Sequence, residues 1–278
     1  MQYYFAKEIK GNKALLYEKD LHHIKNVMRM KKNDEIMVVY NKKKYNSVIV
    51  SMSPVIEIEI KKENQLDTEL SKEIIIAFGM IKEQKQDFMM QKLAELGVSK
   101  LIPLDMERSV VKIDPKKEEK KLERWRLILK EASEQSHRSS VPELTKIMSI
   151  KDLEKEDADL KLVLSVNEKT KMLKNVLQNI DNYDRIIIVV GPEGGITPKE
   201  EKKLSELGFQ SVSLGNRILR AETASIYITS IINYCCMRWI YGQVSKLFSK
   251  YEDGGNGFIY YDCCLYYNSY SNVNFVGI

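Results

Sequence analysis

Short segments of alternating apolar and polar residues occupy the first part of the chain. Three such segments lie between Glu35 and Ile60, with the sequences EIMVVY, YNSVIVSM and VIEIEI, and the turn-forming NKKK separates the first two. A period of two residues indicates strands that bury one face. The pattern therefore predicts a small antiparallel sheet or barrel near the N-terminus.

One short amphipathic helix is predicted immediately before these strands, within LHHIKNVMRMKKND. The spacing i, i+3, i+6, i+7 brings apolar residues to one side of such a helix. That buried side would consist of Leu21, Ile24, Val27 and Met28. The opposite side would expose Lys25, Arg29 and Lys32 to solvent.

After a polar, charged segment from Lys62 to Glu73, the best linker candidate, the pattern changes to buried apolar runs that alternate with amphipathic helices. The runs include EIIIAFGMI, DLKLVLSV and RIIIVVGPEGG. This alternation indicates βα units, a parallel sheet and helices on both of its faces. The pattern predicts three parts: residues 1–69 as a small β domain, 70–241 as an α/β domain, and 242–278 as an atypical tail that is rich in Tyr from residue 251.

Composition and charge narrow the class of protein. A length of 278 residues suggests two domains, and 44% hydrophobic with 30% charged residues indicates a globular chain. The net charge is +5, and residues 1–50 carry eleven Lys and Arg against five Asp and Glu. The first 20 residues lack the apolar core of a signal peptide, and polar residues interrupt the apolar stretch 224–241. We therefore expect a cytoplasmic protein with no membrane span.

Several familiar chemistries have no matching motif. Neither a GxGxxG after a strand nor a GKS/GKT P-loop occurs. The four cysteines form two vicinal pairs, 235–236 and 263–264, which suit a reducing compartment and lack the spacing of a zinc site. His22, His23 and His137 add no metal-binding spacing to them. We expect no bound metal.

Glycine-rich loops at strand ends are the candidate ligand sites, because ligands of open α/β sheets lie beyond the carboxyl ends of the strands. One loop is Gly191–Gly195, which would otherwise be a tight turn before a helix capped by Thr197. A second, LGNRILRAETA at 214–224, places polar groups at a helix N-terminus, where a solvated charge pair is the simpler interpretation. A third, Gly79-Met80, precedes Lys82, Lys85 and Gln86, which is ordinary helix-start polarity.

One more polar cluster, EQSHRSSVP at 134–142, follows a predicted helix. Such residues are ordinarily solvated. If they line a cleft instead, Arg138 offers a planar fork of donors to a phosphate or a base edge.

Four stretches together resemble the RsmE-type 16S rRNA (uracil-N3) methyltransferases of the SPOUT superfamily. They are QKLAELGVSKLIPLDMERSVVK (91–112), EASEQSHRSSVP (131–142), VGPEGGITPKE (190–200) and LGNRILRAETA (214–224), and the N-terminal YYF with HHIKNVMRMKKNDEI is similar as well. The resemblance covers roughly residues 1–241. The last two motifs in combination carry most of its specificity.

The resemblance implies an α/β SPOUT domain with a C-terminal trefoil knot, preceded by a small PUA-like β-barrel that binds RNA. It also implies a homodimer that uses S-adenosyl-L-methionine (SAM) and acts on 16S rRNA or the assembled small ribosomal subunit. The implied cofactor-binding residues are Gly191, Pro192, Glu193, Gly194, Leu214, Gly215, Ile218, Leu219, Ala221 and Thr223. Our own candidates for RNA contacts are Lys25, Arg29 and Lys32, which are suited to phosphates, and Arg138 from the polar cluster at 134–142. The tail from about residue 251 departs from the family pattern.

Two residues of the second loop suit the implied chemistry. Uracil N3 becomes a good nucleophile only as its proton leaves, and Glu222 is the acid available in this loop to accept or steer that proton. Arg220 would offset the negative charge that spreads onto the uracil oxygens. Two alternatives stay open: a SPOUT methyltransferase that modifies another RNA position, and an RNA-binding protein without catalysis.

Overall fold

A computed structural model describes the backbone of residues 1–248 and the side chains of residues 1–236. Its first sheet has six strands in the order β1-β4-β5-β6-β3-β2. Their bounds are β1 (Gln2–Phe5), β2 (Glu8–Lys10), β3 (Lys13–Leu15), β4 (Glu35–Tyr40), β5 (Lys43–Ser51) and β6 (Glu57–Asn64). All pairs are antiparallel except β1 with β4, and alternate residues such as Ile36, Val38 and Ile58 form the core. The predicted antiparallel sheet is confirmed.

The predicted helix before β4 is shorter than its periodicity suggests. It consists of α1 (Glu18–His22) and a single π turn, η1 (His23–Val27). The wider π turn, closed by the bond from Met28 N to His23 O (2.9 Å), rotates the following side chains away from the core. Val27 and Met28 are 59% and 39% exposed, so the prediction that they are buried is wrong.

A second six-stranded sheet follows, in the order β12-β10-β11-β7-β8-β9, and all its pairs are parallel. Its strands are β7 (Glu73–Gly79), β8 (Lys100–Leu104), β9 (Glu143–Leu144), β10 (Leu160–Leu164), β11 (Arg185–Val190) and β12 (Gln210–Val212). The central strands β7 and β11 are buried on both faces, which explains their uninterrupted apolar runs. The predicted parallel sheet is confirmed.

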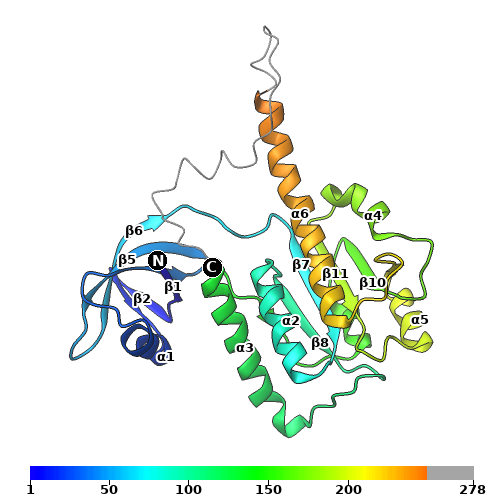
Figure 1. The fold of residues 1–278 in the computed structure, drawn as a ribbon, viewed down its shortest axis with the longest axis horizontal. Coiled ribbons are helices and arrows are strands. Elements are labelled where there is room, and N and C mark those ends of the chain that lie inside the picture. The colour runs from blue at the N-terminus through cyan, green and yellow to red at the C-terminus, as the bar shows by residue number, and fades with distance from the viewer. Residues whose placement is uncertain (249–278) are drawn as a thin grey trace. The chain divides into compact units, whose positions relative to one another are not determined.

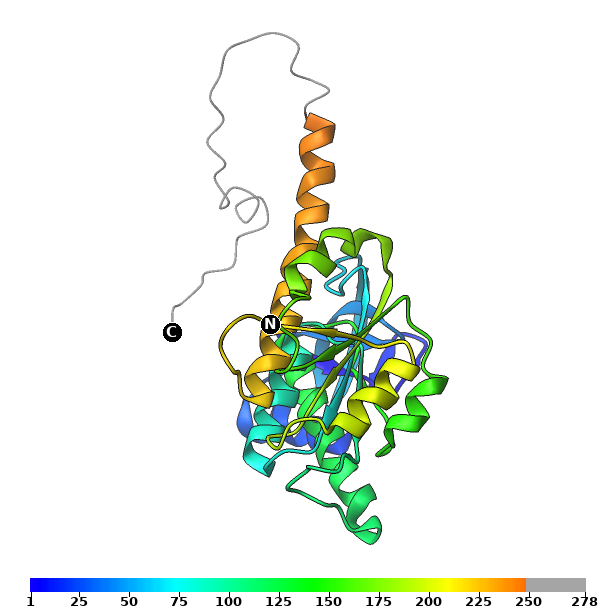
Figure 2. The same cartoon turned by 90° about the vertical axis from the view of Figure 1, so that its right-hand side faces the viewer.

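Helices cover both faces of this sheet (Figures 1 and 2). They are α2 (Glu83–Glu95), α3 (Glu118–Gln135), α4 (Leu173–Val176), α5 (Pro198–Glu206) and α6 (Ala221–Phe248), with 3₁₀ turns η2 (Pro115–Lys117), η3 (Ile150–Lys155) and η4 (Leu177–Asn182). One face packs Ile74, Ile76 and Phe78 with α2, α3 and α6, and the other packs Ile75 and Ala77 with α5. Within the described residues, none of these helices has the length and apolar character to cross a membrane.

Helix α6 extends beyond residue 241, where the α/β part was expected to end. The expected tail at 242–278 therefore begins inside a helix, and its remainder lies outside the described residues. Both sheets belong to one compact unit, Met1–Trp239. Helix α3 contacts the part of the chain that holds the first sheet: Phe5 N of β1 donates a hydrogen bond to the Glu134 carboxylate (3.0 Å), and Lys130 forms an ion pair with Asp20 of α1 (2.7 Å).

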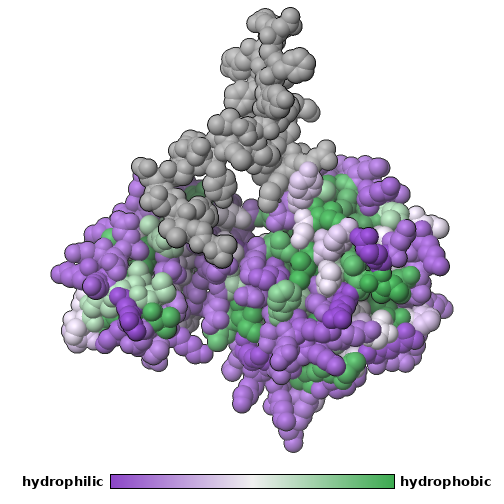
Figure 3. All heavy atoms as spheres, in the orientation of Figure 1, coloured by the Kyte–Doolittle hydropathy of each residue, from purple (hydrophilic) through white to green (hydrophobic). Residues whose placement is uncertain are grey.

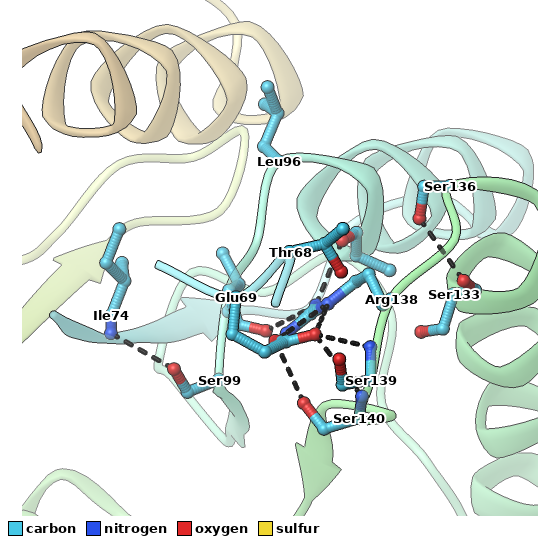
Figure 4. A network of polar contacts seen from close by, with 12 residues as sticks. Thr68, Glu69, Ile74, Leu96, Ser99, Ser133, Ser136, Arg138, Ser139 and Ser140 are labelled. Carbon is cyan, nitrogen blue, oxygen red and sulfur yellow. Dashed lines mark hydrogen bonds and ion pairs between the residues drawn. The ribbon is translucent and has the colours of Figure 1, made fainter. Parts of the chain in front are cut away.

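The segment that joins the two sheets is fixed in place rather than a free linker. Its Glu69 carboxylate accepts hydrogen bonds from the Arg138 guanidinium and from Ser139 N (2.7 Å), as Figure 4 shows. Arg138 is 3% exposed, and its Nη1 donates to the carbonyls of Ala94 (2.9 Å) and Val98 (2.8 Å). Because these acceptors occupy a buried guanidinium, the prediction that Arg138 contacts RNA is wrong.

Candidate active site

A cavity of about 450 Å³ lies at the carboxyl ends of β10, β11 and β12. Its walls come from the loop after β10, the glycine-rich loop after β11, the loop after β12 and the first turn of α6. The lining includes Ser165, Asn167, Glu168, Gly191, Gly194, Ile196, Leu214, Gly215, Ile218, Leu219 and Ala221, with Arg108 from the loop after β8. This is the edge at which an open α/β sheet binds its ligands.

Eight of the ten residues predicted to bind the cofactor line this cavity: Gly191, Pro192, Gly194, Leu214, Gly215, Ile218, Leu219 and Ala221. The other two, Glu193 and Thr223, are exposed and do not line it. The Glu193 carboxylate instead accepts a hydrogen bond from Lys82 N (3.3 Å) at the start of α2. The two glycine-bearing loops, far apart in the chain, therefore meet at one site.

Close packing explains the glycines of the first loop. A Cβ atom at Gly194 would lie 2.8 Å from both Cβ and O of Arg108, and one at Gly191 would lie 2.7 Å from Cγ1 of Ile196. The loop also leads into a capped helix, as the alternative interpretation of its sequence predicted, because Thr197 and Glu200 form a capping box at the start of α5. The same loop lines the cavity and caps the helix that follows it.

The loop after β10 is a wall that sequence reasoning missed. Ser165 Oγ donates to the Glu201 carboxylate (2.7 Å), which fixes the start of the loop against α5. Hydrogen bonds from the hydroxyl and amide of Thr170 and from Lys171 N lower the pKa of Glu168 to about 2. The signal was present, since a polar segment follows the apolar run DLKLVLSV at a strand end.

The two predicted catalytic residues lie beside the cavity rather than on its wall. Glu222 is 9% exposed, and its Oε2 is buried without a hydrogen-bond partner among the described residues. The nearest cation is Lys85, whose Nζ lies 3.6 Å from Glu222 Oε1. Arg220 is exposed, and its side chain makes no hydrogen bond or ion pair within residues 1–236. The structure thus places Glu222 with Lys85 but does not bring Arg220 to them.

The remaining predicted RNA contacts, Lys25, Arg29 and Lys32, are all exposed on the first sheet's side of the chain, near the exposed Val27 and Met28. None of them belongs to the cavity. Among the described residues, no group of His, Cys, Asp and Glu side chains is arranged to hold a metal ion.

Comparison with known proteins defines the class to which this fold and site belong. Residues 68–233 match the family model of the RNA methyltransferase domain, and residues 16–59 match that of the RNA methyltransferase PUA domain. The chain is therefore an RNA methyltransferase with a PUA domain ahead of the catalytic domain.

Similarity to individual proteins shows which family of RNA methyltransferases the chain belongs to. The chain is 38% identical over 226 residues to ribosomal RNA small subunit methyltransferase E of Bacillus subtilis, covering 77% of this chain and 87% of that one. It is 33% identical to the protein of the same name from Mesomycoplasma hyopneumoniae, covering 82% and 97%. The chain belongs to the ribosomal RNA small subunit methyltransferase E family.

Solved structures agree with this assignment. Ribosomal RNA small subunit methyltransferase E from Neisseria gonorrhoeae, bound to SAM, superposes with a TM-score of 0.76 at 30% identity, covering 84% of this chain and 97% of that one. A putative methyltransferase from Legionella pneumophila, in complex with the cofactor SAM, gives 0.75 at 28% identity, with coverage of 84% and 96%.

Proposed function

We propose that this protein transfers the methyl group of SAM to N3 of a uridine in the 16S rRNA of the small ribosomal subunit. The observation that carries the proposal is the cavity in which the loops after β10, β11 and β12 converge. The names of the relatives support rRNA of the small subunit as the substrate, and two structural neighbours hold SAM.

The residues around the cavity fit SAM. Apolar side chains such as Leu164, Met172 and Leu219 offer a surface for a flat nucleobase, while polar groups of the loop after β10 offer partners for the charged end. Gly215, at φ 120°, has open space where a side chain would project. When bound, SAM supplies an electrophilic methyl group that an aligned nucleophile displaces from sulfur.

The protein's own groups would prepare that nucleophile. Glu222 would accept the N3 proton, directly or through water, a contribution of roughly 10² to 10⁴ in rate for a positioned base. Arg220, whose side chain is exposed and unpaired within the described residues, would turn toward the uracil oxygens and offset their negative charge.

The RNA would be held by the basic N-terminal part. Lys25, Arg29 and Lys32 are exposed and suited to phosphate contacts. Because N3 lies on the pairing edge of the base, the target uridine must be unpaired or flipped out of its stack before it can react.

The trefoil knot of the SPOUT fold and a cytoplasmic homodimer are part of the same proposal. The resemblance of the loops after β11 and β12 to the family's knot motifs supports the knot. Exposed Tyr227 (42%) and Tyr234 (63%), seven residues apart on α6, support a partner surface along one side of that helix. Figure 3 also shows hydrophobic patches on this face beside the described part of α6 and toward α4.

The test combines calorimetry and product mapping. Titration of the purified protein with SAM should show micromolar binding, and incubation with small subunits that lack the modification should place one methyl group on N3 of a uridine, located by nuclease digestion and mass spectrometry. Glu222→Gln should bind SAM with nearly unchanged affinity and turn over more slowly. A methyl group on another atom, or a folded protein that does not bind SAM, would contradict the proposal.

A further inference from the structure

Lys85 and Glu222 lie side by side but form no hydrogen bond with each other. Lys85 is in the first turn of α2, and Glu222 is the second residue of α6. Their Nζ and Oε1 atoms are 3.6 Å apart, and the side chains are 33% and 11% exposed. Within the described part of the chain, neither side chain makes a hydrogen bond to any other group.

The pair lies next to the cavity. Ala221 and Ala224, on either side of Glu222 in the sequence, both line the cavity wall. The start of α2 is fastened to the same site, because Lys82 N donates to Glu193 and because Gly79 packs against Pro192 without room for a Cβ atom. Lys85 and Glu222 thus lie beside the cavity, next to residues of its wall, although neither of them lines it.

An ordinary surface ion pair does not account for this arrangement. Exposed pairs contribute little, and their charges remain solvated. Here, in contrast, Glu222 Oε2 is buried with no donor, which is costly for a carboxylate unless a ligand supplies one. The Lys85 ammonium forms a long ion pair with Glu222 (3.6 Å) and donates no hydrogen bond to any described residue, so it has donors to offer to another acceptor. The site therefore presents one unused acceptor beside one unused donor.

We propose that Lys85 and Glu222 together recognise the imide edge of the target uracil, and that Lys85 is a specificity-determining residue. This inference rests on the proposed function. The edge of uracil presents N3–H as a donor between two carbonyl acceptors. Glu222 accepts from N3–H once the Lys85 side chain swings aside, and Lys85 donates to an adjacent carbonyl oxygen. Cytosine, whose N3 is an acceptor, would face the carboxylate with no proton to donate.

The pair also serves the methyl transfer. The N3 proton passes to the Glu222 carboxylate, the bond from N3 to the methyl carbon forms as the bond from carbon to sulfur breaks, and S-adenosylhomocysteine leaves. Negative charge that develops on the uracil carbonyl during this step is balanced by the Lys85 ammonium.

The first experiment removes the donor. Lys85→Met should lower kcat/KM for methylation of unmodified small subunits roughly 10- to 100-fold, as expected for a lost hydrogen bond to a charged group. SAM affinity, measured by calorimetry, should be unchanged, and Lys85→Arg should recover part of the activity. Lys92→Met serves as the matched control, because Lys92 is on the same helix and its contacts are an ion pair with Glu95 (2.7 Å) and the Phe88 ring, both on α2. It should match the wild type.

The second experiment measures base recognition without turnover. Binding of an RNA fragment that carries the target uridine is compared with binding of the same fragment with cytidine at that position. The wild type should prefer uridine, and both Lys85→Met and Glu222→Gln should reduce that preference. If the wild type methylates N3 and Lys85→Met is as active as the wild type, this inference alone is overturned. The same holds if the preference for uridine over cytidine survives both substitutions. Failure of the wild type to methylate N3 would overturn the proposed function, and this inference with it.

Discussion

Arg138 and Glu69 are 69 residues apart in the sequence, yet Nη2 of the arginine lies 2.6 Å from Oε2 of the glutamate (Figure 4). The arginine side chain is 4% exposed and the glutamate side chain 22%. The contact ties the segment between the two sheets to the turn after α3. Through Ala94 O and Val98 O, it also reaches the end of α2. These contacts hold the segment between β6 and β7 in place where the second sheet begins.

Arg138→Met is expected to destabilise the protein by about 3–5 kcal/mol, because it leaves a partly buried carboxylate without its cationic partner and removes the guanidinium donor from two carbonyl groups. Urea denaturation at neutral pH measures the change. Lys155→Met is the control, since Lys155 is 82% exposed and its pair with Asp152 spans 3.7 Å. That substitution should stay within about 0.5 kcal/mol of the wild type. If the two variants lose equal free energy of unfolding, the buried pair of Arg138 and Glu69 does not stabilise the fold more than an exposed pair does.

The same pair predicts a loss of stability in acid. Burial alone would raise the pKa of Glu69, but the Arg138 guanidinium and the donors of Ser139 and Ser140 outweigh it and hold the pKa below its usual value. The folded state then binds this proton less readily than the unfolded state, whose Glu pKa is about 4.3. The stabilisation is complete above that pH and is lost as the pH falls through the lower, folded pKa.

Unfolding curves of the wild type and Glu69→Gln, recorded from about pH 7 to about pH 3, test this sign. The advantage of the wild type should shrink toward the acidic end. Glu134→Gln provides a contrast, because burial raises the pKa of Glu134 despite its bonds to Lys130 and Phe5 N. A carboxyl group with a raised pKa contributes stability that is lost as the pH rises. The stability of the wild type relative to Glu134→Gln should therefore increase toward acidic pH, whereas its stability relative to Glu69→Gln should decrease. A wild-type advantage over Glu69→Gln that does not vary with pH would refute the assignment.

The two sheets were predictable because each rests on a strong local pattern. The strand Ile186–Val190 is apolar throughout, and only a strand buried on both faces fits such a run between glycine and charged residues. The loops at its end were predictable too, since their glycines follow strands. The loop after β10 was missed because it lacks glycine, although it ends a strand in the same way.

Other features depend on long-range contacts that no local pattern reveals. Arg138 follows a helix among polar residues and looks solvated, but Glu69 and two carbonyl groups surround it. Val27 fits a helical stripe, and a single π turn moves it into solvent. Lys85 and Glu222 are 137 residues apart, and only the packing of α2 beside α6 shows that they meet.

Gly215 provides a sharp test of the cavity. It has φ 120° and lines the cavity, while Gly208 has φ 86° and does not line it, and a Cβ atom would meet nothing within 4 Å at either position. Alanine at either site therefore imposes backbone strain of a similar kind, of order 1 kcal/mol. Gly215→Ala should weaken SAM binding at least tenfold by calorimetry, whereas Gly208→Ala should retain wild-type affinity. Equal affinities in the two variants would place the cofactor elsewhere.

Arg29 occupies a backbone conformation that glycine would adopt at lower cost. Its φ is 52°, and the chain turns around it through the hydrogen bond from Met30 N to Ile24 O (3.0 Å) at the end of the π turn. A non-glycine residue in this left-handed region costs roughly 1 kcal/mol. Its side chain is exposed and makes no hydrogen bond or ion pair with the described residues that would offset this cost. An arginine at such a position is better explained by a ligand than by the fold.

Arg29→Gly should consequently stabilise the protein by up to about 1 kcal/mol while weakening its binding to rRNA. Loss of one phosphate contact should reduce the slope of log affinity against log salt by about one. Asn33→Gly is the control: Asn33 also has a positive φ, 74°, but asparagine tolerates that region and carries no charge. It should leave the salt slope unchanged. Stability reports the backbone effect of the substitution, and the salt dependence of RNA binding reports its electrostatic effect. If Arg29→Gly gains stability but keeps the full slope of log affinity against log salt, the arginine is not an RNA contact.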